Sequence, residues 1–222
     1  MRVRDGSGAP TQSRTARQRA RNRQKLITAA TQVMATGGPA SLTVTAVTEN
    51  ADLGAGTFYN YFDSREDIIA AVIIDALESM GQRLDALTHD MDDPAEIYSV
   101  SLRHLVGAAA SEPLWGWLLV RLGVAQEELI NILGPRAERD LQKGIDAGRF
   151  SIPDLPIATA VYFGGLLSTM HAHLHGSASD NPGTVFAEYM LRAVGLSTDE
   201  AHEIAQRPLP PLPLLPNADD PR

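Results

Sequence analysis

Hydroxyl and amide side chains are concentrated in residues 43–65, which end at the basic Arg65, and these groups can hydrogen-bond to phosphate oxygens and to base edges. Phe58 and Phe62 fall four residues apart, on one face of a predicted helix, so the tyrosines and the asparagine between them lie on other faces. The stretch therefore has the side chains of a DNA-reading surface. The candidate DNA-binding residues are Arg17, Arg21, Thr43, Thr45, Ala55, Gly56, Thr57, Tyr59, Asn60, Tyr61 and Arg65.

Two short helices and the start of a third position these side chains. Thr43 can cap a helix of about Val44–Asn50, because its hydroxyl can accept a hydrogen bond from a free backbone N–H group. A short polar turn leads to the second helix, Ala55–Phe62. Ser64 can cap the next helix, with Asp67 at its third position completing a reciprocal pair of caps. The order helix, turn, helix is the pattern whose second helix enters the major groove of DNA.

The run LGAGTFYNYFDSRED, residues 53–67, resembles the signature of the TetR family of bacterial repressors. The chain departs from that signature at Ala55, where the family often has a polar or basic residue, so the resemblance does not imply a polar side-chain contact to a base or phosphate at this position. The motif-bearing resemblance covers roughly residues 20–70. The matching positions are Gly56, Thr57, Phe58, Tyr59, Tyr61, Phe62, Ser64, Arg65 and Glu66.

The resemblance implies an all-α homodimer with two domains per subunit. Residues 14–62 would form a three-helix DNA-binding domain that recognises a palindromic operator in double-stranded DNA. Residues 63–205 would dimerise and bind a small, largely apolar effector. The implied activity is that of a ligand-responsive transcriptional repressor, in which the effector moves the long helix that starts near Arg65 and changes the separation of the two reading helices.

The charge of the chain is unevenly distributed. Its net charge is −8, yet residues 1–25 contain eight basic residues and one acidic residue. A basic segment next to an acidic body can dock on phosphates, or it can be a solvated tail; its place before the helix-turn-helix favours the first interpretation. Cysteine is absent, and no secretion signal or membrane span is visible, which predicts a cytoplasmic protein.

Helical periodicity continues through the rest of the chain and predicts no strand. Residues 1–13 are expected to be a disordered arm. Residues 206–222 are rich in proline and form a tail of polyproline character, which is either laid over the partner subunit or loose. Two apolar helices near the C-terminus predict the subunit interface. The expected helices are Arg14–Gly37, Arg65–His89, Pro94–Ala110, one from Pro113, one interrupted at Gly134–Pro135 and continuing toward Gly148, Pro156–His175 and Pro182–Val194.

The central helices offer apolar walls with a few polar groups, a mixture typical of small-molecule pockets. His104 and Arg121 are the groups that could orient a ligand. The two tryptophans either fill the core or line the cavity. The candidate effector-binding residues are Met80, Leu84, Tyr98, Leu102, His104, Trp115, Trp117, Leu118, Arg121 and Phe163.

Other functions have weaker support. His171 and His175 share a helical face, but His173 points away and no further ligand falls at metal-binding spacing, so neither a metal nor a cofactor is expected. No catalytic motif is present, which disfavours an enzyme. The alternative of a helical small-molecule-binding protein that never touches DNA would leave the arginines and the residues 59–61 without a role.

Overall fold

The computed structural model describes residues 14–111 and 125–214, and they are helical with no strand, as the sequence predicts. The chain divides into two compact units, residues 1–72 and 73–222. The boundary between the units falls inside one helix, α4 (Arg65–Thr88). None of the described helices combines the length and the apolar character that crossing a bilayer requires.

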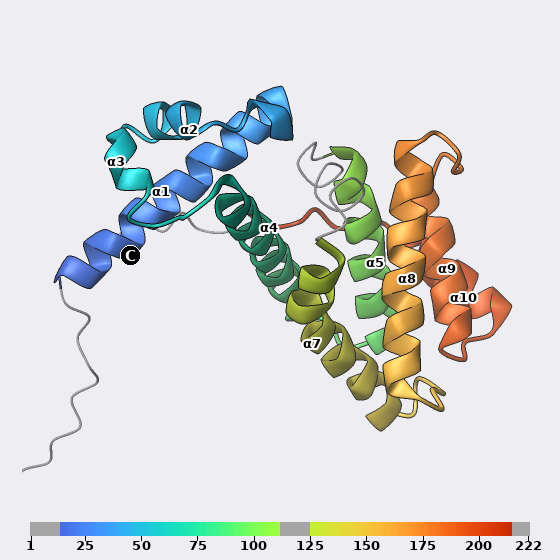
Figure 1. Cartoon of the computed structure of the whole chain (residues 1–222). Helices are drawn as coiled ribbons and strands as arrows, with labels where there is room; N and C mark the ends of the chain where they lie inside the picture. Colours follow the sequence, from blue (N-terminus) through green and yellow to red (C-terminus); the bar gives the residue numbers. More distant parts are fainter. Residues whose placement is uncertain (1–13, 112–124, 215–222) are drawn as a thin grey trace, which may run out of the picture. The chain divides into compact units, whose positions relative to one another are not determined.

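The first unit contains α1 (Arg14–Gly37), a short 3-10 turn (Pro39–Ser41), α2 (Val44–Asn50), α3 (Ala55–Phe58) and the start of α4 (Figure 1). Its core forms where the apolar face of α1 meets side chains from the other helices, because each of these helices has apolar residues on one side only. The buried residues include Leu26, Ile27, Ala30, Met34, Val47, Phe58, Phe62 and Ile68.

Both predicted helix caps are confirmed. The Thr43 hydroxyl accepts a hydrogen bond from the Ala46 N–H at 3.1 Å. At the start of α4, Asp67 N–H donates to the Ser64 hydroxyl at 3.1 Å, and the Asp67 carboxylate accepts from Ser64 N–H at 3.0 Å. Each bond satisfies a backbone donor that has no partner within its helix, so both helix starts are fixed by local sequence.

The second short helix is shorter than predicted, since α3 ends at Phe58 rather than at Phe62. The chain continues as a tight turn in which Asn60 N–H donates to the Thr57 carbonyl and Tyr61 N–H to the Phe58 carbonyl, at 3.2 and 2.9 Å. Bonds between residues three apart tighten the last turn of a helix. Phe62 is nevertheless buried beside Phe58, with ring centroids 5.7 Å apart, because the turn keeps both rings on one side.

The described part of the second unit contains the rest of α4 and the five helices α5 and α7–α10. Helix α5 is packed against α7, α8, α9 and α10 (Figure 1), and its side chains from Tyr98 to Ala109 supply much of the core. The five helices are α5 (Pro94–Ser111), α7 (Ala125–Asp146), α8 (Leu155–Leu174), α9 (Pro182–Ala193) and α10 (Thr198–Gln206).

Helix α7 runs without interruption through Pro135, so the expected break at Gly134–Pro135 is wrong. A proline inside a helix removes one hydrogen bond, the one its N–H would donate to the carbonyl four residues earlier. Pro135 and Asn131 both face solvent, so water can satisfy the carbonyl that Pro135 leaves free. The position of the proline on the exposed side of α7 explains why the helix tolerates it.

Residues Arg207–Leu214, called the strap below, lie along the chain's own α4 and α5. Three side chains hold the strap by donating to its carbonyl oxygens: Arg103 to Arg207, His104 to Pro210 and Arg83 to Pro213. The described part of the proline-rich tail is therefore docked within its own subunit. His104, predicted to orient an effector, binds the strap through its Nε2 atom at 2.9 Å.

We expect His104 to make the stability of the protein depend on pH. Burial lowers the pKa of His104 from its ordinary 6.5, the bond to Pro210 opposes this effect, and the neighbouring Arg103 and Arg83 add to it. A lowered pKa means that the folded state binds the proton less tightly than the unfolded state, so stability falls as the pH drops below about 6.5. Denaturant unfolding from pH 8 to pH 5 should show a smaller acid loss in His104→Gln than in the wild type. Parallel curves for the two proteins would contradict the assignment.

Candidate functional site

The predicted DNA-binding side chains lie on the surface of the first unit. Tyr59 is 62% exposed and Asn60 is exposed, whereas Thr57 and Tyr61 are half-buried. The Tyr59 ring meets the buried Phe58 ring edge-on, with centroids 5.4 Å apart. The phenylalanine thus anchors a turn whose polar residues reach solvent. The other exposed members of the set are Arg17, Arg21, Thr43, Thr45, Ala55, Gly56 and Arg65.

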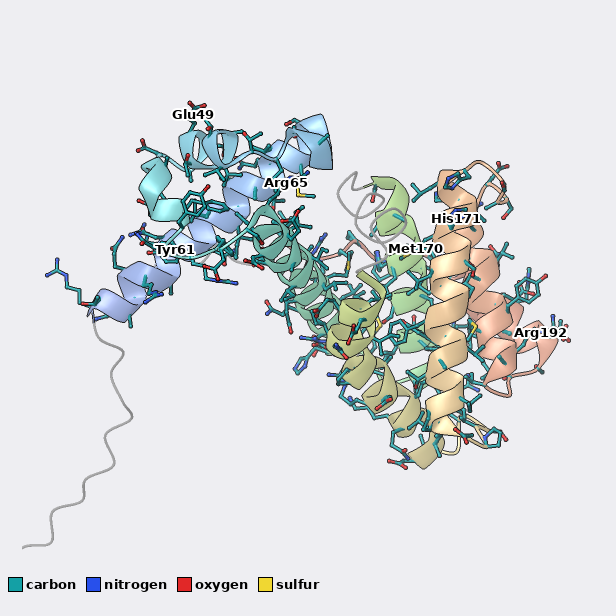
Figure 2. The ribbon with its side chains drawn as sticks, viewed as in Figure 1. Glu49, Tyr61, Arg65, Met170, His171 and Arg192 are labelled. Carbon is teal, nitrogen blue, oxygen red and sulfur yellow. The ribbon has the colours of Figure 1, made fainter. Side chains whose placement is uncertain are left out.

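Arg65 also has a structural contact. Its Nε atom donates to the Leu42 carbonyl at 3.0 Å, which ties the first residue of α4 to the segment before α2. Figure 2 shows Arg65 at the start of α4 and Tyr61 in the turn after α3, both in the first unit. The side chain therefore helps to hold the unit together in addition to any contact with a phosphate.

Sequence analysis missed two arginines that hold the turn after α3. Arg19 donates to the Asn60 carbonyl at 3.5 Å and its guanidinium lies 5.9 Å from the centroid of the Tyr61 ring. The guanidinium of Arg23 lies 5.3 Å from the centroid of the Phe62 ring. Cations over aromatic faces contribute about 0.5–1 kcal/mol each at exposed sites. Arg19 and Arg23 are four residues apart and so lie on one face of α1, and this spacing could have indicated their shared role from the sequence.

An open recess of about 380 Å³ lies beside this turn. Its walls come from the N-terminal part of α1 and from the turn, and its polar groups are a guanidinium, amides and hydroxyls, which suit a phosphate. The recess is lined by Thr15, Gln18, Arg19, Asn60 and Tyr61.

The second unit contains a cavity of about 40 Å³ between α4, α5, α7 and α8. Two of the predicted effector residues, Leu84 and Tyr98, line it. Three others, Met80, Leu102 and Phe163, are buried but are not among the lining residues. Trp115, Trp117, Leu118 and Arg121 lie outside the described residues. The cavity lining is Gly81, Leu84, Asp85, Thr88, Tyr98, Ser101, Leu105, Leu133, Arg136, Ala137, Asp140 and Tyr162.

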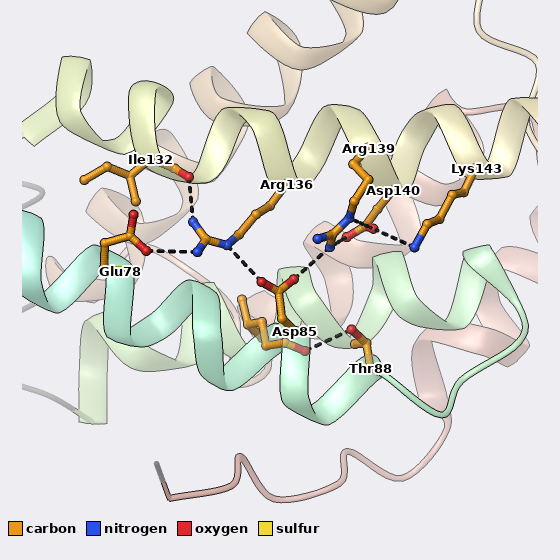
Figure 3. A network of polar contacts seen from close by, with 9 residues as sticks. Glu78, Asp85, Thr88, Ile132, Arg136, Arg139, Asp140 and Lys143 are labelled. Carbon is orange, nitrogen blue, oxygen red and sulfur yellow. Dashed lines mark hydrogen bonds and ion pairs between the residues drawn. The ribbon is translucent and has the colours of Figure 1, made fainter. Parts of the chain in front are cut away.

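Arg136 is the principal polar group of the cavity wall that sequence analysis missed. It donates to Glu78 at 2.9 Å and to Asp85 at 3.0 Å on α4, and to the Ile132 carbonyl on its own helix at 2.9 Å (Figure 3). Arg139 donates to the other Asp85 oxygen at 2.8 Å and to Asp140 at 2.9 Å. The ion pairs join α7 to α4 along one side of the cavity.

These contacts decide which groups of the cavity are charged. Burial alone would raise the pKa of Asp85, but hydrogen bonds from Arg139 and Arg136 outweigh it and lower the pKa, so the carboxylate is ionised. Burial raises the pKa of Tyr98 and of Tyr162, with Asp140 adding to the effect at Tyr162. Both phenols therefore stay neutral and keep a proton that they can donate to a ligand.

The histidines weighed as a metal site are not part of the cavity: His171 and His173 lie on α8, and His175 is the residue that follows it. The rings of His171 and His175 are stacked with centroids 4.1 Å apart, and His175 Nδ1 is 2.8 Å from the His171 carbonyl. Figure 2 shows His171 near the C-terminal end of α8. His173 is half-buried and makes no described contact with either ring.

Comparison with known proteins decides the family. Residues 26–72 match the family model "Bacterial regulatory proteins, tetR family", and residues 93–207 match "Tetracyclin repressor-like, C-terminal domain". The chain belongs to the TetR family. This TetR-family chain is accordingly a DNA-binding transcriptional regulator, in a family whose members bind operators as homodimers and bind small-molecule ligands.

One solved structure is similar to the chain in sequence and fold, and two others are similar in fold. RolR in complex with resorcinol is 44% identical, with a TM-score of 0.79 over 89% of this chain and 100% of that one. SmeT, the repressor of the Stenotrophomonas maltophilia multidrug efflux pump SmeDEF, is 20% identical, with a TM-score of 0.61 over 77% of this chain and 89% of that one. FadR from Bacillus subtilis, in complex with stearoyl-CoA, is 20% identical with a TM-score of 0.59, over 77% and 96%. No curated protein sequence matches the chain.

Tyr59 gives a direct test of the reading surface of this TetR-family regulator. Tyr59→Ala removes an exposed ring and hydroxyl, so operator affinity should fall by about tenfold or more, in the range of one good base or phosphate contact. Tyr59→Phe, which loses only the hydroxyl, should show how much of that loss is hydrogen bonding. Fluorescence anisotropy with operator DNA measures both variants, and circular dichroism checks that they fold. Wild-type affinity in folded Tyr59→Ala would remove Tyr59 from the DNA-binding set.

Proposed function

We propose that this chain is a ligand-responsive repressor that leaves its operator when a small hydroxylated aromatic molecule binds in the cavity of the second unit. The observation that carries the proposal is the cavity itself, where leucine and tyrosine walls surround Arg136, Asp85 and Asp140. Apolar walls with a few fixed polar groups are the usual composition of a small-molecule site. RolR, which is 44% identical to this chain, binds resorcinol, a one-ring diphenol, and resorcinol is the natural first probe.

The size of the cavity limits the ligand to about one ring. The volume of about 40 Å³ exceeds the ~10–15 Å³ that one water needs, but it is smaller than the ~150 Å³ cavity that holds benzene in an engineered protein. A one-ring ligand can therefore bind only if the walls move apart. Larger ligands would need a still larger displacement, so this state of the cavity favours a compact molecule.

The charges of the cavity favour a neutral ligand. The guanidinium of Arg136 is already shared by Glu78 and Asp85, so it offers an acidic ligand no unpaired positive charge. The carboxylates of Asp85 and Asp140 can accept hydrogen bonds, and hydroxyl groups on a ring are suitable donors. A neutral phenol or diphenol fits these groups better than an aromatic acid does.

Helix α4 gives a physical route from the cavity to the DNA-binding unit. Its second half supplies Gly81, Leu84, Asp85 and Thr88 to the cavity wall, and its first residue, Arg65, donates to Leu42 in the first unit. A ligand that displaces α4 thus acts on a helix that both units share. A coupling of about 1–3 kcal/mol would lower operator affinity roughly 5- to 150-fold, provided that the ligand binds the DNA-free state more tightly.

The exposed apolar faces of α8 and α9 are the proposed dimer interface. On α8, Ile157 and Val161 are 62% and 54% exposed, and on α9 Tyr189 is 63% exposed. An exposed apolar face of this kind is typical of a surface that a second copy covers.

The two glycines of α8 have different surroundings. Gly164 is exposed on the same side as Ile157 and Val161, whereas a side chain at Gly165 would meet Phe186 of its own subunit at 2.9 Å. Gly165 therefore serves packing between α8 and α9 rather than contact with the partner.

The effector site is tested by removing single polar groups of the cavity. Asp140→Asn keeps the shape and removes the charge, and Tyr162→Phe removes only a hydroxyl. Hydrogen bonds to charged groups contribute about 1.5–3 kcal/mol, so resorcinol affinity should fall by about tenfold or more in Asp140→Asn, with operator affinity in its absence unchanged. Calorimetry measures binding, and anisotropy with operator fragments selected from genomic DNA measures release. Asp146→Asn, on the same helix but outside the cavity, is the matched control.

Two results would contradict this proposal. If resorcinol binds Asp140→Asn and Tyr162→Phe as well as it binds the wild type, the ligand site is elsewhere. If resorcinol and related phenols stabilise the protein but leave operator affinity unchanged, the cavity does not control DNA binding.

The dimer interface is tested with a charge on the exposed face of α8. Val161→Glu should shift the protein from dimer to monomer at micromolar concentration, because burying an unpaired carboxylate is costly. Operator affinity should fall as the dimer dissociates, since a monomer contacts only one half-site and binds it weakly. Ile130→Glu, an exposed apolar residue on α7, is the control and should leave the dimer intact. Sedimentation velocity decides the outcome, and a stable Val161→Glu dimer would place the interface elsewhere.

A further inference from the structure

The strap is held through its backbone, at every third residue. Arg103 Nη1 donates to the Arg207 carbonyl at 2.7 Å, and Arg83 Nε donates to the Pro213 carbonyl at 3.2 Å. Between them, His104 Nε2 lies 2.9 Å from the Pro210 carbonyl and must carry the proton, because a carbonyl can only accept. The three acceptors stand at equal intervals along the chain.

An interval of three residues is the repeat of the polyproline II helix, which has three residues per turn and no internal hydrogen bonds. The exposure of the strap follows the same repeat. Residues 207, 210 and 213 are half-buried, whereas residues 208, 211 and 214 are exposed. The carbonyls of residues 207, 210 and 213 therefore face α4 and α5, and the donors bind these carbonyls rather than side chains of the strap.

The two helices that hold the strap also form walls of the effector cavity. On α4, Arg83 binds the strap and the next residue, Leu84, lines the cavity; on α5, His104 binds the strap and Leu105 lines the cavity. Neighbouring residues in a helix point about 100° apart, so each helix presents one side to the strap and another to the cavity. Any movement of α4 away from α5 must therefore lengthen or break strap contacts.

We propose that Arg83, Arg103 and His104 form a groove that binds a polyproline II segment, that the strap occupies this groove within its own subunit, and that the docked strap opposes ligand entry. The last part, that the docked strap opposes ligand entry, rests on the function proposed above. The cavity of about 40 Å³ must expand to admit a ring, and its walls α4 and α5 are the helices that the strap joins. The family model for the C-terminal domain matches only as far as residue 207, so residues 208–214 lie beyond it.

The groove is tested with the strap supplied as a separate peptide. A chain ending at Arg207 loses residues 208–214 of the strap, and a chain ending at Leu214 keeps the whole strap and serves as the control. A labelled peptide of residues 207–214, RPLPPLPL, should bind the shorter chain and not the longer one, in which the groove is occupied. The same peptide with its four prolines replaced by glycine should bind more weakly, because glycine removes the preformed conformation. Arg83→Gln and His104→Ala in the shorter chain should each weaken binding.

The coupling is tested in the full-length protein and in both shortened chains. Without the strap, backbone amides of residues 81–88 and 98–105 should exchange hydrogen faster than in the chain that keeps it. Resorcinol should bind at least about fivefold more tightly, which is the lower end of the usual range of allosteric coupling. A full-length chain with Pro208, Pro210, Pro211 and Pro213 replaced by glycine should shift in the same direction, which guards against misfolding of the shortened chain.

Each part of the proposal can fail separately. A peptide that does not bind the shorter chain, or that binds its glycine version equally well, overturns the groove. Peptide binding with identical hydrogen exchange in the chains ending at Arg207 and Leu214 overturns the coupling. If resorcinol binds neither chain, the proposed ligand is wrong, while the peptide and exchange measurements still decide the strap.

Discussion

The ion pairs of Arg136 fix the helix that closes the cavity. The guanidinium bonds to Glu78 and Asp85 on α4 while its third bond returns to α7, so one side chain joins two points of α4 that lie about two turns apart. Glycine at position 81 leaves room for it, because a Cβ atom there would lie 2.8 Å from the guanidinium carbon and the guanidinium would have to shift. The pairs are partly exposed, and solvent screens such pairs to about 0–1 kcal/mol each. They therefore position α4 and α7 relative to each other more than they stabilise the fold.

Helix α4 consequently takes part in several different contacts. Its N-terminus is capped by Ser64, its first residue bonds to Leu42, one side lines the cavity and another binds the strap. Within the second unit, the cavity wall and the strap contacts involve neighbouring residues of α4, so a ligand that displaces this part of the helix also changes its contacts with the strap. Switching by small displacements is possible because packed helices have discrete arrangements and do not deform continuously.

The features that could be predicted from the sequence are those that depend on residues close together in the chain. The caps at Thr43 and Ser64, the inward Phe58 and Phe62, and the helix order are determined within a few residues, so spacing reveals them. The cavity was predicted less well. Arg136 meets partners 51 and 58 residues away, and nothing in the local pattern of α7 distinguishes it from other arginines on a solvated face. The break expected at Pro135 failed for a related reason, since the cost of a proline depends on whether its side of the helix faces water.

The strap shows how a segment without regular hydrogen bonds can still be ordered. Fixing one residue's backbone costs about 1–2 kcal/mol in entropy, which three hydrogen bonds could not offset over eight flexible residues. Proline reduces that cost because its ring fixes φ before docking, and four of the seven residues after Arg207 are proline. The net free energy that holds the strap is therefore small. Movement of α4 can displace a segment that is held so weakly, whereas a helix packed through a full apolar face would resist displacement.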